Sequence, residues 1–222
     1  MQHTYWVTRG KKHYVNKEVI ELMCFDLLNI FEASKGIVES RTEMLEIPAI
    51  SGTGEVELSD EKARLLILHN KYAFMQISKT ILQLGLLIRT FDDQMKTGDQ
   101  ADAYLNQLSG INRSNIGFLS GEKKLTIRYA CNKIIHSEEV EPLYETQNYL
   151  FADNELLRDS ESNIFGYLSG EILLRGSAKK QPWEATLYVQ NFIESILELI
   201  HFEPEKIASK ASKASKASKE AM

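Results

Sequence analysis

Apolar residues recur every three or four positions near the N-terminus, which predicts an amphipathic helix over residues 14–34. The positions that share its apolar face are Val19, Ile20, Met23, Leu27 and Phe31. Asn16 precedes them and is a residue type favoured at helix N-caps. The pattern extends through Gly36 toward Glu46, and Pro48 then begins a loop. We therefore expect one long helix before Pro48.

A second helical segment is longer. Ser59 is followed by Asp60 and Glu61, which favour a helix start, and the chain then continues without proline to about Met95. Its apolar face is formed by Leu66, Tyr72, Met75, Ile81, Leu84, Ile88 and Phe91. At about 1.5 Å per residue this helix exceeds roughly 50 Å, unless Gly85 divides it. We expect it to be the spine of a bundle, with its broad apolar surface covered by other helices or by a second subunit.

Shorter elements follow in the rest of the chain. Those predicted from periodicity and glycine spacing are a helix over 99–109, a helix over 121–137 capped by Ser120, a hairpin near 165–176, a third strand at 184–189 and an amphipathic helix over 187–202. The predicted fold class is therefore mainly α: a helical bundle with a long central helix and a small β-hairpin appendage near 165–189. It forms one helical domain over residues 1–204.

Composition narrows the class of protein. The chain has 222 residues, of which 43% are hydrophobic and 26% charged, as is typical of a folded globular domain. It has no run of about 18 apolar residues, and its N-terminus lacks the apolar core of a secretory signal, so no membrane partner is expected. Cys24 and Cys131 are too few for a disulfide scaffold and suit a reducing compartment. We therefore expect a cytoplasmic protein.

Charge separates a lysine-rich tail from an acidic body. Residues 205–222 contain five lysines and two glutamates, so they carry +3, and residues 1–204 carry −8 of the total of −5. The Ala-Ser-Lys repeat of the tail predicts a disordered segment, with an electrostatic tether for a polyanion as the alternative. An acidic body is not typical of a general nucleic-acid binder, but net charge does not exclude a small basic groove.

The residues with the clearest chemistry lie between Leu125 and Glu138. The chain lacks phosphate-loop, zinc-protease and serine-hydrolase motifs, and its five histidines are scattered, so no metal or cofactor is expected. Arg128, Asn132 and His136 are four residues apart and share one helix face, with Lys133 beside them. Histidine suits proton transfer and arginine suits phosphate binding. In the alternative interpretation, Asn132 and His136 are structural and hydrogen-bond neighbouring backbone.

The segment Asn132–His136, preceded by Arg128, resembles the conserved helix of HEPN-like proteins, which are all-helical domains associated with nucleotides and RNA. It is most similar to an uncharacterised bacterial and phage branch, in which a glycine-containing hairpin and a tryptophan follow, as Leu173–Gly176 and Trp183 do here. The resemblance covers residues 120–202 and implies a homodimer. In nuclease members, arginine and histidine form a metal-independent ribonuclease site, in which the RNA 2′-hydroxyl attacks the adjacent phosphate.

On this chain, the resemblance implies catalytic roles for His136, Asn132 and Arg128, and substrate binding by Lys133. In the nuclease motif the arginine lies four to six residues before the histidine. Here Cys131 stands five before His136, and Arg128 lies eight before it, about 12 Å along a helix.

The function expected from this resemblance is that of a HEPN-like protein that binds, or cleaves, RNA or a nucleotide in bacterial or phage defence or stress. If it is an enzyme, it is a metal-independent endoribonuclease. The alternative is a non-enzymatic interaction or scaffolding protein, which binds another protein and uses the Asn-His motif structurally.

Other polar and aromatic residues have simpler interpretations. Trp183 is expected to pack the hairpin on the bundle, and His69 to lie at the boundary of the apolar run 65–68. The carboxylates expected to be solvated helix ends are Asp92, Asp93, Glu138 and Glu139.

Overall fold

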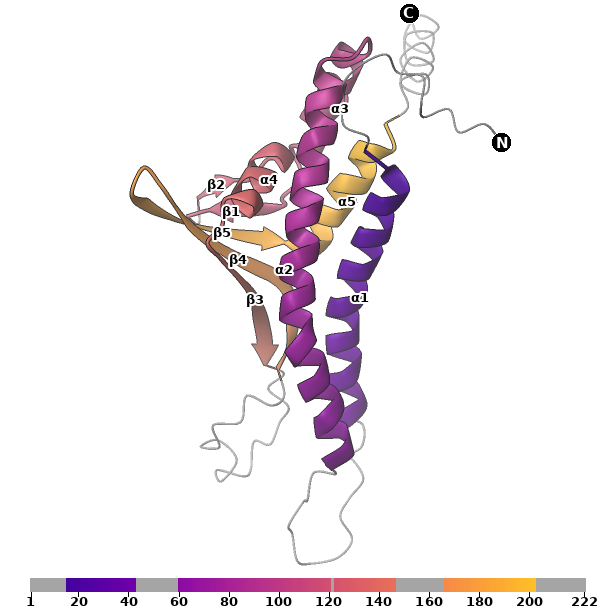
Figure 1. Ribbon diagram of the computed structural model, residues 1–222, viewed down its shortest axis with the longest axis vertical. Helices are drawn as coiled ribbons and strands as arrows, with labels where there is room; N and C mark the ends of the chain where they lie inside the picture. Colours follow the sequence, from indigo (N-terminus) through magenta and orange to yellow (C-terminus); the bar gives the residue numbers. More distant parts are fainter. Residues whose placement is uncertain (1–14, 43–59, 121, 147–165, 203–222) are drawn as a thin grey trace, which may run out of the picture.

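The computed structural model describes residues 15–42, 60–120, 122–146 and 166–202, which form a mixed α/β fold (Figure 1). The helices are α1 (Lys17–Thr42), α2 (Asp60–Lys96), α3 (Ala101–Ile111), α4 (Ile127–Ile135) and α5 (Val189–Ile200). The strands are β1 (Gly117–Leu119), β2 (Lys123–Lys124), β3 (Glu139–Thr146), β4 (Gly166–Ala178) and β5 (Gln181–Tyr188). The prediction of a mainly α bundle with a small hairpin is therefore wrong, because these strands join into one antiparallel sheet. The predicted tail lies outside the described residues.

The two long N-terminal helices form as the periodicity predicted. The side-chain oxygen of Asn16 accepts a hydrogen bond from the backbone N–H of Glu18 at 2.9 Å, which confirms the predicted cap of α1. The helix α2 lies between α1 on one side and α4 with the sheet on the other (Figure 1). Gly85 does not divide α2. A Cβ at this position would lie 3.1 Å from Cγ2 of Ile134, so the glycine allows α4 to pack closely against α2.

The sheet has the strand order β2-β1-β5-β4-β3, with every neighbouring pair antiparallel. The hairpin predicted within 165–176 is instead a single strand, β4, and the chain reverses at Lys179 and Lys180. Both lysines have positive φ, 52° and 67°, as a two-residue type I′ turn requires. Gly170 suggested the turn, but it lies inside β4, beside a shift in the register with β3.

The segment before α4 also differs from its prediction. Lys123 and Lys124, which were expected to lie at the start of a helix after Ser120, form strand β2 instead, and Ser120 lies between β1 and β2 with a φ of 50°. The helix starts only after Thr126, whose hydroxyl oxygen accepts a hydrogen bond from the backbone N–H of Tyr129 at 3.3 Å. The start of α4 is also held by Asn112, whose side-chain oxygen accepts a hydrogen bond from the backbone N–H of Ile127 at 3.2 Å. This long-range capping shortens α4 at its N-terminal end.

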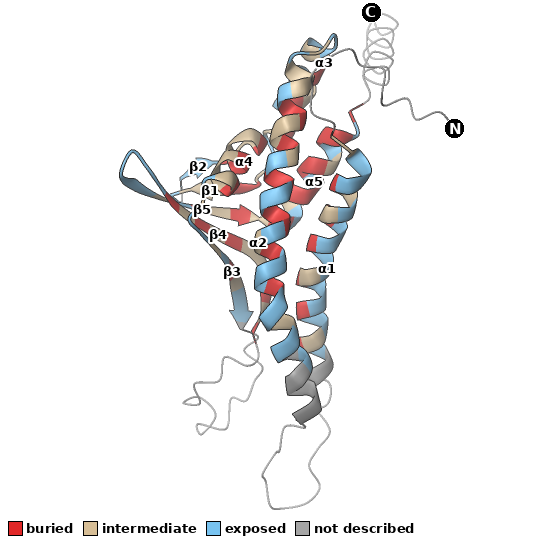
Figure 2. Ribbon diagram, in the orientation of Figure 1, coloured by how far each residue is buried: buried red, intermediate tan, exposed pale blue. Residues whose placement is uncertain are grey.

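One hydrophobic core joins the helices to the inner face of the sheet (Figure 2). Alternate residues of β4 are buried, among them Leu168, Ile172 and Leu174, as expected for a strand with one face packed on helices. The hydroxyl oxygen of Ser34 on α1 accepts a hydrogen bond from the N–H of Leu168 at 3.0 Å, which fixes α1 against β4. In the part of the chain that the structure describes, no helix is long and apolar enough to cross a membrane.

Candidate functional site

A groove of about 300 Å³ lies beside α4, where this helix meets the β1–β2 hairpin. The residues that line it are Lys123, Lys124, Thr126, Arg128, Tyr129 and Asn132. Two of the residues predicted to form the site, Arg128 and Asn132, therefore lie in the groove. The structure adds two lysines from β2, an element that the sequence did not predict.

His136 is placed differently from Arg128 and Asn132. It is the exposed residue that follows the last turn of α4, and its backbone N–H donates to the carbonyl oxygen of Asn132 at 3.1 Å. It does not line the groove. The catalytic roles implied for His136, Asn132 and Arg128 therefore stay predictions.

Arg128 and Asn132 make their contacts with the C-terminal part of α2. The Arg128 guanidinium forms ion pairs with both Asp92 and Asp93, the latter at 2.7 Å, and Arg89 donates a hydrogen bond to the side-chain oxygen of Asn132. Arg89 also lies 3.4 Å from a carboxylate oxygen of Asp93. These contacts join α4 to α2 through charged side chains.

Asp92 is the centre of this arrangement. Its side chain is 1% exposed, so the prediction of a solvated helix end is wrong for this residue. Besides Arg128, its carboxylate accepts a hydrogen bond from the Tyr104 hydroxyl at 2.9 Å and one from the Lys96 ammonium at 2.8 Å. A buried carboxylate needs such partners because its desolvation is costly. We call the residues that share these contacts the Asp92 cluster: Arg89, Asp92, Asp93, Lys96, Tyr104, Arg128 and Asn132.

The charges within the Asp92 cluster stabilise one another. A hydrogen bond from Arg128 is the main cause that lowers the pKa of the exposed Asp93 carboxyl. Burial disfavours the charged form of Arg128, but its hydrogen bonds to Asp93 and Asp92 outweigh this effect and raise its pKa. Arg128 is therefore a cation whose charge is already compensated inside the protein.

A second set of cations borders the groove and has a different environment. The Lys133 ammonium lies 3.8 Å from the centroid of the Trp183 ring and 5.3 Å from that of Tyr129. The Lys123 ammonium lies 4.9 Å from the Tyr129 centroid. These distances are within the range of cation–π attraction. We call Lys123, Lys124, Tyr129, Lys133 and Trp183 the basic–aromatic strip.

The lysines of the basic–aromatic strip differ from Arg128 in their partners. Among the described residues, Lys123, Lys124 and Lys133 form no ion pair with a carboxylate. Burial, and then the positive charge of Lys123, lower the pKa of Lys133. The strip is therefore a local concentration of uncompensated positive charge on a chain whose net charge is negative.

Trp183 reaches the strip because the hairpin leaves space for it. A Cβ at Gly176, its partner on β4, would lie 2.5 Å from Cζ2 of the indole, so a larger residue at that position would displace the ring. Trp183 also packs against the edge of the core, in agreement with its predicted anchoring role. In the sequence, the strip is indicated by the pair Lys123-Lys124 with Tyr129 five residues after it, and Trp183 joins these residues only when β5 pairs with β1.

The remaining candidate residues have structural surroundings. Nε2 of His69 on α2 donates to the carbonyl oxygen of Ile30 on α1 at 3.0 Å. Cys24 and Cys131 are buried, which raises the pKa of each thiol to about 12 and keeps it protonated. Among the described residues, no group of three histidine, cysteine or acidic side chains could hold a metal ion. Glu138 and Glu139 are exposed, as predicted.

The groove holds Lys123, Lys124 and Tyr129, and Lys133 and Trp183 continue the strip from the Tyr129 ring, so uncompensated ammonium groups lie next to two aromatic rings. Ammonium groups bind phosphate, and aromatic rings stack on nucleobases, so together they suit a ligand that has both. Comparison of the chain with known proteins finds no matching family model, no similar curated protein and no similar solved structure.

Proposed function

We propose that the protein binds single-stranded RNA, or a nucleotide as its minimal unit, along the basic–aromatic strip. The observation that carries this proposal is the placement of Lys123, Lys124 and Lys133, without carboxylate partners, beside the rings of Tyr129 and Trp183. Cation–π contacts hold two of the ammonium groups in place, which reduces the entropy lost when they bind phosphate.

The size of the groove agrees with this ligand. Small-molecule sites usually have volumes of about 300–1,000 Å³, and the groove lies at the lower limit of that range. It therefore suits one nucleotide, with the rest of an RNA strand running over the exposed lysines of β2. The resemblance of Asn132–His136 to HEPN-like proteins supports the same class of ligand, although the sheet departs from the all-helical fold of that family.

Cleavage of the bound RNA is a second candidate function. His136 is exposed and lies three residues after Lys133, so the two side chains can face the same side at the end of α4. In such a site Lys133 would bind the phosphate that the resemblance assigns to arginine, because Arg128 is engaged by Asp92 and Asp93. Incubation with labelled RNA in excess EDTA tests this role: cleavage to 2′,3′-cyclic ends that is lost in His136→Ala supports it.

Binding is tested by fluorescence anisotropy with a labelled single-stranded RNA, measured at several salt concentrations. Lys133→Gln is expected to weaken binding roughly tenfold and to reduce the salt slope by about 0.7, as for the loss of one phosphate contact. Lys17→Gln is the matched control, because Lys17 lies 5.7 Å from the ring centroid of Phe91, away from the groove. Equal losses in both variants, or no binding by the wild type, would contradict the proposal and favour the scaffolding alternative.

A further inference from the structure

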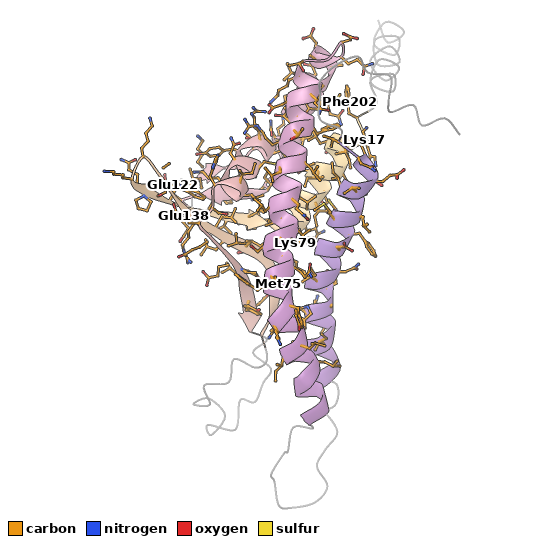
Figure 3. All side chains as sticks on the ribbon, in the orientation of Figure 1. Lys17, Met75, Lys79, Glu122, Glu138 and Phe202 are labelled. Carbon is orange, nitrogen blue, oxygen red and sulfur yellow. The ribbon has the colours of Figure 1, made fainter. Side chains whose placement is uncertain are left out.

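The helix α2 carries a second apolar stripe on the side away from the core. Its inner stripe is buried in the core and includes Ala73, Ile77, Leu84, Ile88 and Phe91. The outer positions are Leu65, Leu68, Tyr72, Met75, Lys79, Leu82 and Leu86. Six of them are large hydrophobic residues between 43% and 57% exposed. Figure 2 shows the exposed band along α2, and Figure 3 labels Met75 and Lys79 within it. We call these seven residues the outer seam.

The spacing of the outer seam is that of a coiled coil. Its members alternate between steps of three and four residues, which gives the 3.5-residue repeat of heptad positions a and d. This repeat continues from Leu65 to Leu86, about 32 Å along the helix. A helix with apolar residues on opposite faces normally packs between two neighbours. The inner side of α2 is covered by α1, α4 and the sheet, and the outer seam remains exposed, with room for a further helix.

We propose that the outer seam binds the same seam of a second copy of this chain, with the two α2 helices antiparallel. In the symmetric register, Leu82 faces Tyr72 of the partner subunit, Leu86 faces Leu68 of the partner subunit, and Lys79 faces Met75 of the partner subunit. The leucines and the tyrosine of the seam between Leu68 and Leu86 then meet one another, and Met75 meets the aliphatic stem of Lys79. The seam is therefore complementary to itself, as a twofold interface requires.

Lys79 determines the orientation of the two helices. In a parallel in-register pair, each a position faces its own copy, so two Lys79 ammonium groups would meet in the centre of the contact. In the antiparallel pair, each Lys79 packs its aliphatic stem on a methionine and extends its charge outward. The single polar residue of the seam thus disfavours the parallel arrangement.

Charge beside the outer seam also suits a second copy. A groove of about 370 Å³ borders α2 on its sheet side and is lined by Ser78 and Leu82 on α2 and by Glu138 and Glu139. Lys71 lies on the same side of α2, because residues three and four apart share a helix face. In the antiparallel register Lys71 is level with Gln83 of the partner subunit, the residue next to Leu82, which borders these carboxylates. Each copy therefore brings a lysine toward Glu138 of the other, whose carboxylate accepts hydrogen bonds from Ser177 and has no ion-pair partner among the described residues, whereas Glu139 already pairs with Arg175.

The oligomeric state of the full chain tests the interface directly. Wild type is expected to be a dimer by size-exclusion chromatography with light scattering. Met75→Glu is expected to raise the dimer Kd roughly 30-fold or more, the effect of losing a central apolar contact. Leu105→Glu is the control, because Leu105 on α3 is 44% exposed and lies outside the seam. A monomeric wild type, a Met75→Glu variant that stays dimeric, or dissociation by Leu105→Glu would each overturn the proposal.

Disulfide trapping tests the orientation. The two native cysteines are buried, so cysteines introduced at exposed positions react selectively. A mixture of Leu68→Cys and Leu86→Cys is expected to give the mixed disulfide, whereas Leu86→Cys alone gives none, because its two copies lie about 27 Å apart in the antiparallel pair. A disulfide between two Leu86→Cys chains, without the mixed product, would overturn the antiparallel arrangement. None of these measurements involves the basic–aromatic strip, so this proposal and the proposed function fail independently.

Discussion

Two groups of cationic side chains meet at α4, and they differ in what compensates their charge. In the Asp92 cluster, Arg128 and Lys96 contact a carboxylate that is 1% exposed. In the basic–aromatic strip, Lys123 and Lys133 contact aromatic rings and no carboxylate among the described residues. The comparison teaches that charge alone does not identify a ligand-binding residue. A compensated cation joins elements of the fold, whereas an uncompensated one remains available to an anion from outside.

The largest effect is expected from removing the centre of the Asp92 cluster. Asp92→Ala leaves Arg128, Lys96 and the Tyr104 hydroxyl without their shared acceptor, so the free energy of unfolding should fall by about 3 kcal/mol. Urea denaturation measures this change. A loss below about 0.5 kcal/mol would show that the cluster does not stabilise the packing of α4 on α2.

A substitution in the basic–aromatic strip is expected to have a smaller effect, and to lower the affinity for RNA instead of the free energy of unfolding. Tyr129→Leu keeps an apolar contact with the core but removes the ring that Lys123 and Lys133 share. Loss of base stacking should weaken RNA binding by about 1–2 kcal/mol, or roughly tenfold. Anisotropy and urea denaturation are measured on the same sample. If Tyr129→Leu changes stability and leaves affinity unaltered, the ring is structural and the strip does not stack bases.

The variant Arg128→Gln distinguishes most clearly between residues that stabilise the fold, as in the Asp92 cluster, and residues that bind RNA, as in the basic–aromatic strip. Because Arg128 is engaged by Asp92 and Asp93, its loss should cost about 1–2 kcal/mol of stability and change RNA affinity less than twofold. The role implied by the HEPN-like resemblance gives the opposite result, since an arginine that binds phosphate would lower the affinity and the salt slope. The same anisotropy titration distinguishes the two, with Lys133→Gln as the reference.

The smallest effect concerns Asp93 and depends on pH. Arg128 lowers the pKa of this carboxyl in the folded state. Its contribution to stability is therefore present above the unfolded pKa of about 3.9 and is lost as the pH falls through the lower folded value. Asp93 is 53% exposed, so Asp93→Asn should cost less than about 1 kcal/mol at pH 7. Urea denaturation at several pH values should show this difference vanish in acid, and a difference that grows in acid would contradict the assignment.

Helices were easier to predict from this chain than strands. The apolar periodicity of α1 and α2 and the cap at Asn16 depend on residues within one or two turns of each other, so the sequence displays them directly. The sheet depends on distant pairing: Gly117 of β1 faces Leu187 of β5. A two-residue strand such as β2 has no periodicity of its own, and the Lys179–Lys180 turn lacks the glycine or asparagine that usually indicates a hairpin.

The residues of the candidate site also fall into those that local spacing predicted and those that only the folded structure brings together. Spacing alone placed Arg128, Asn132 and Lys133 on one helix, which is α4 in the structure. It gave no indication that Asp92 is the buried partner of Arg128, because the two residues are 36 positions apart in the chain. Nor did it join Lys123 and Trp183 to the site, since these residues belong to strands that pair only in the folded protein.

Helical periodicity acts over three or four residues, so the amino-acid pattern was sufficient to predict the long helices and the polar side chains that share a face of α4. Which of those side chains remains available to a ligand depends on how the elements pack. When α4 packs on α2, the carboxylates of Asp92 and Asp93 compensate Arg128. When β5 pairs with β1 and β4, the neighbour of the Lys133 ammonium is the Trp183 ring and not a carboxylate, so its charge is not compensated. The electrostatic environment of a side chain depends on neighbours in space, and only the packing of the elements determines these.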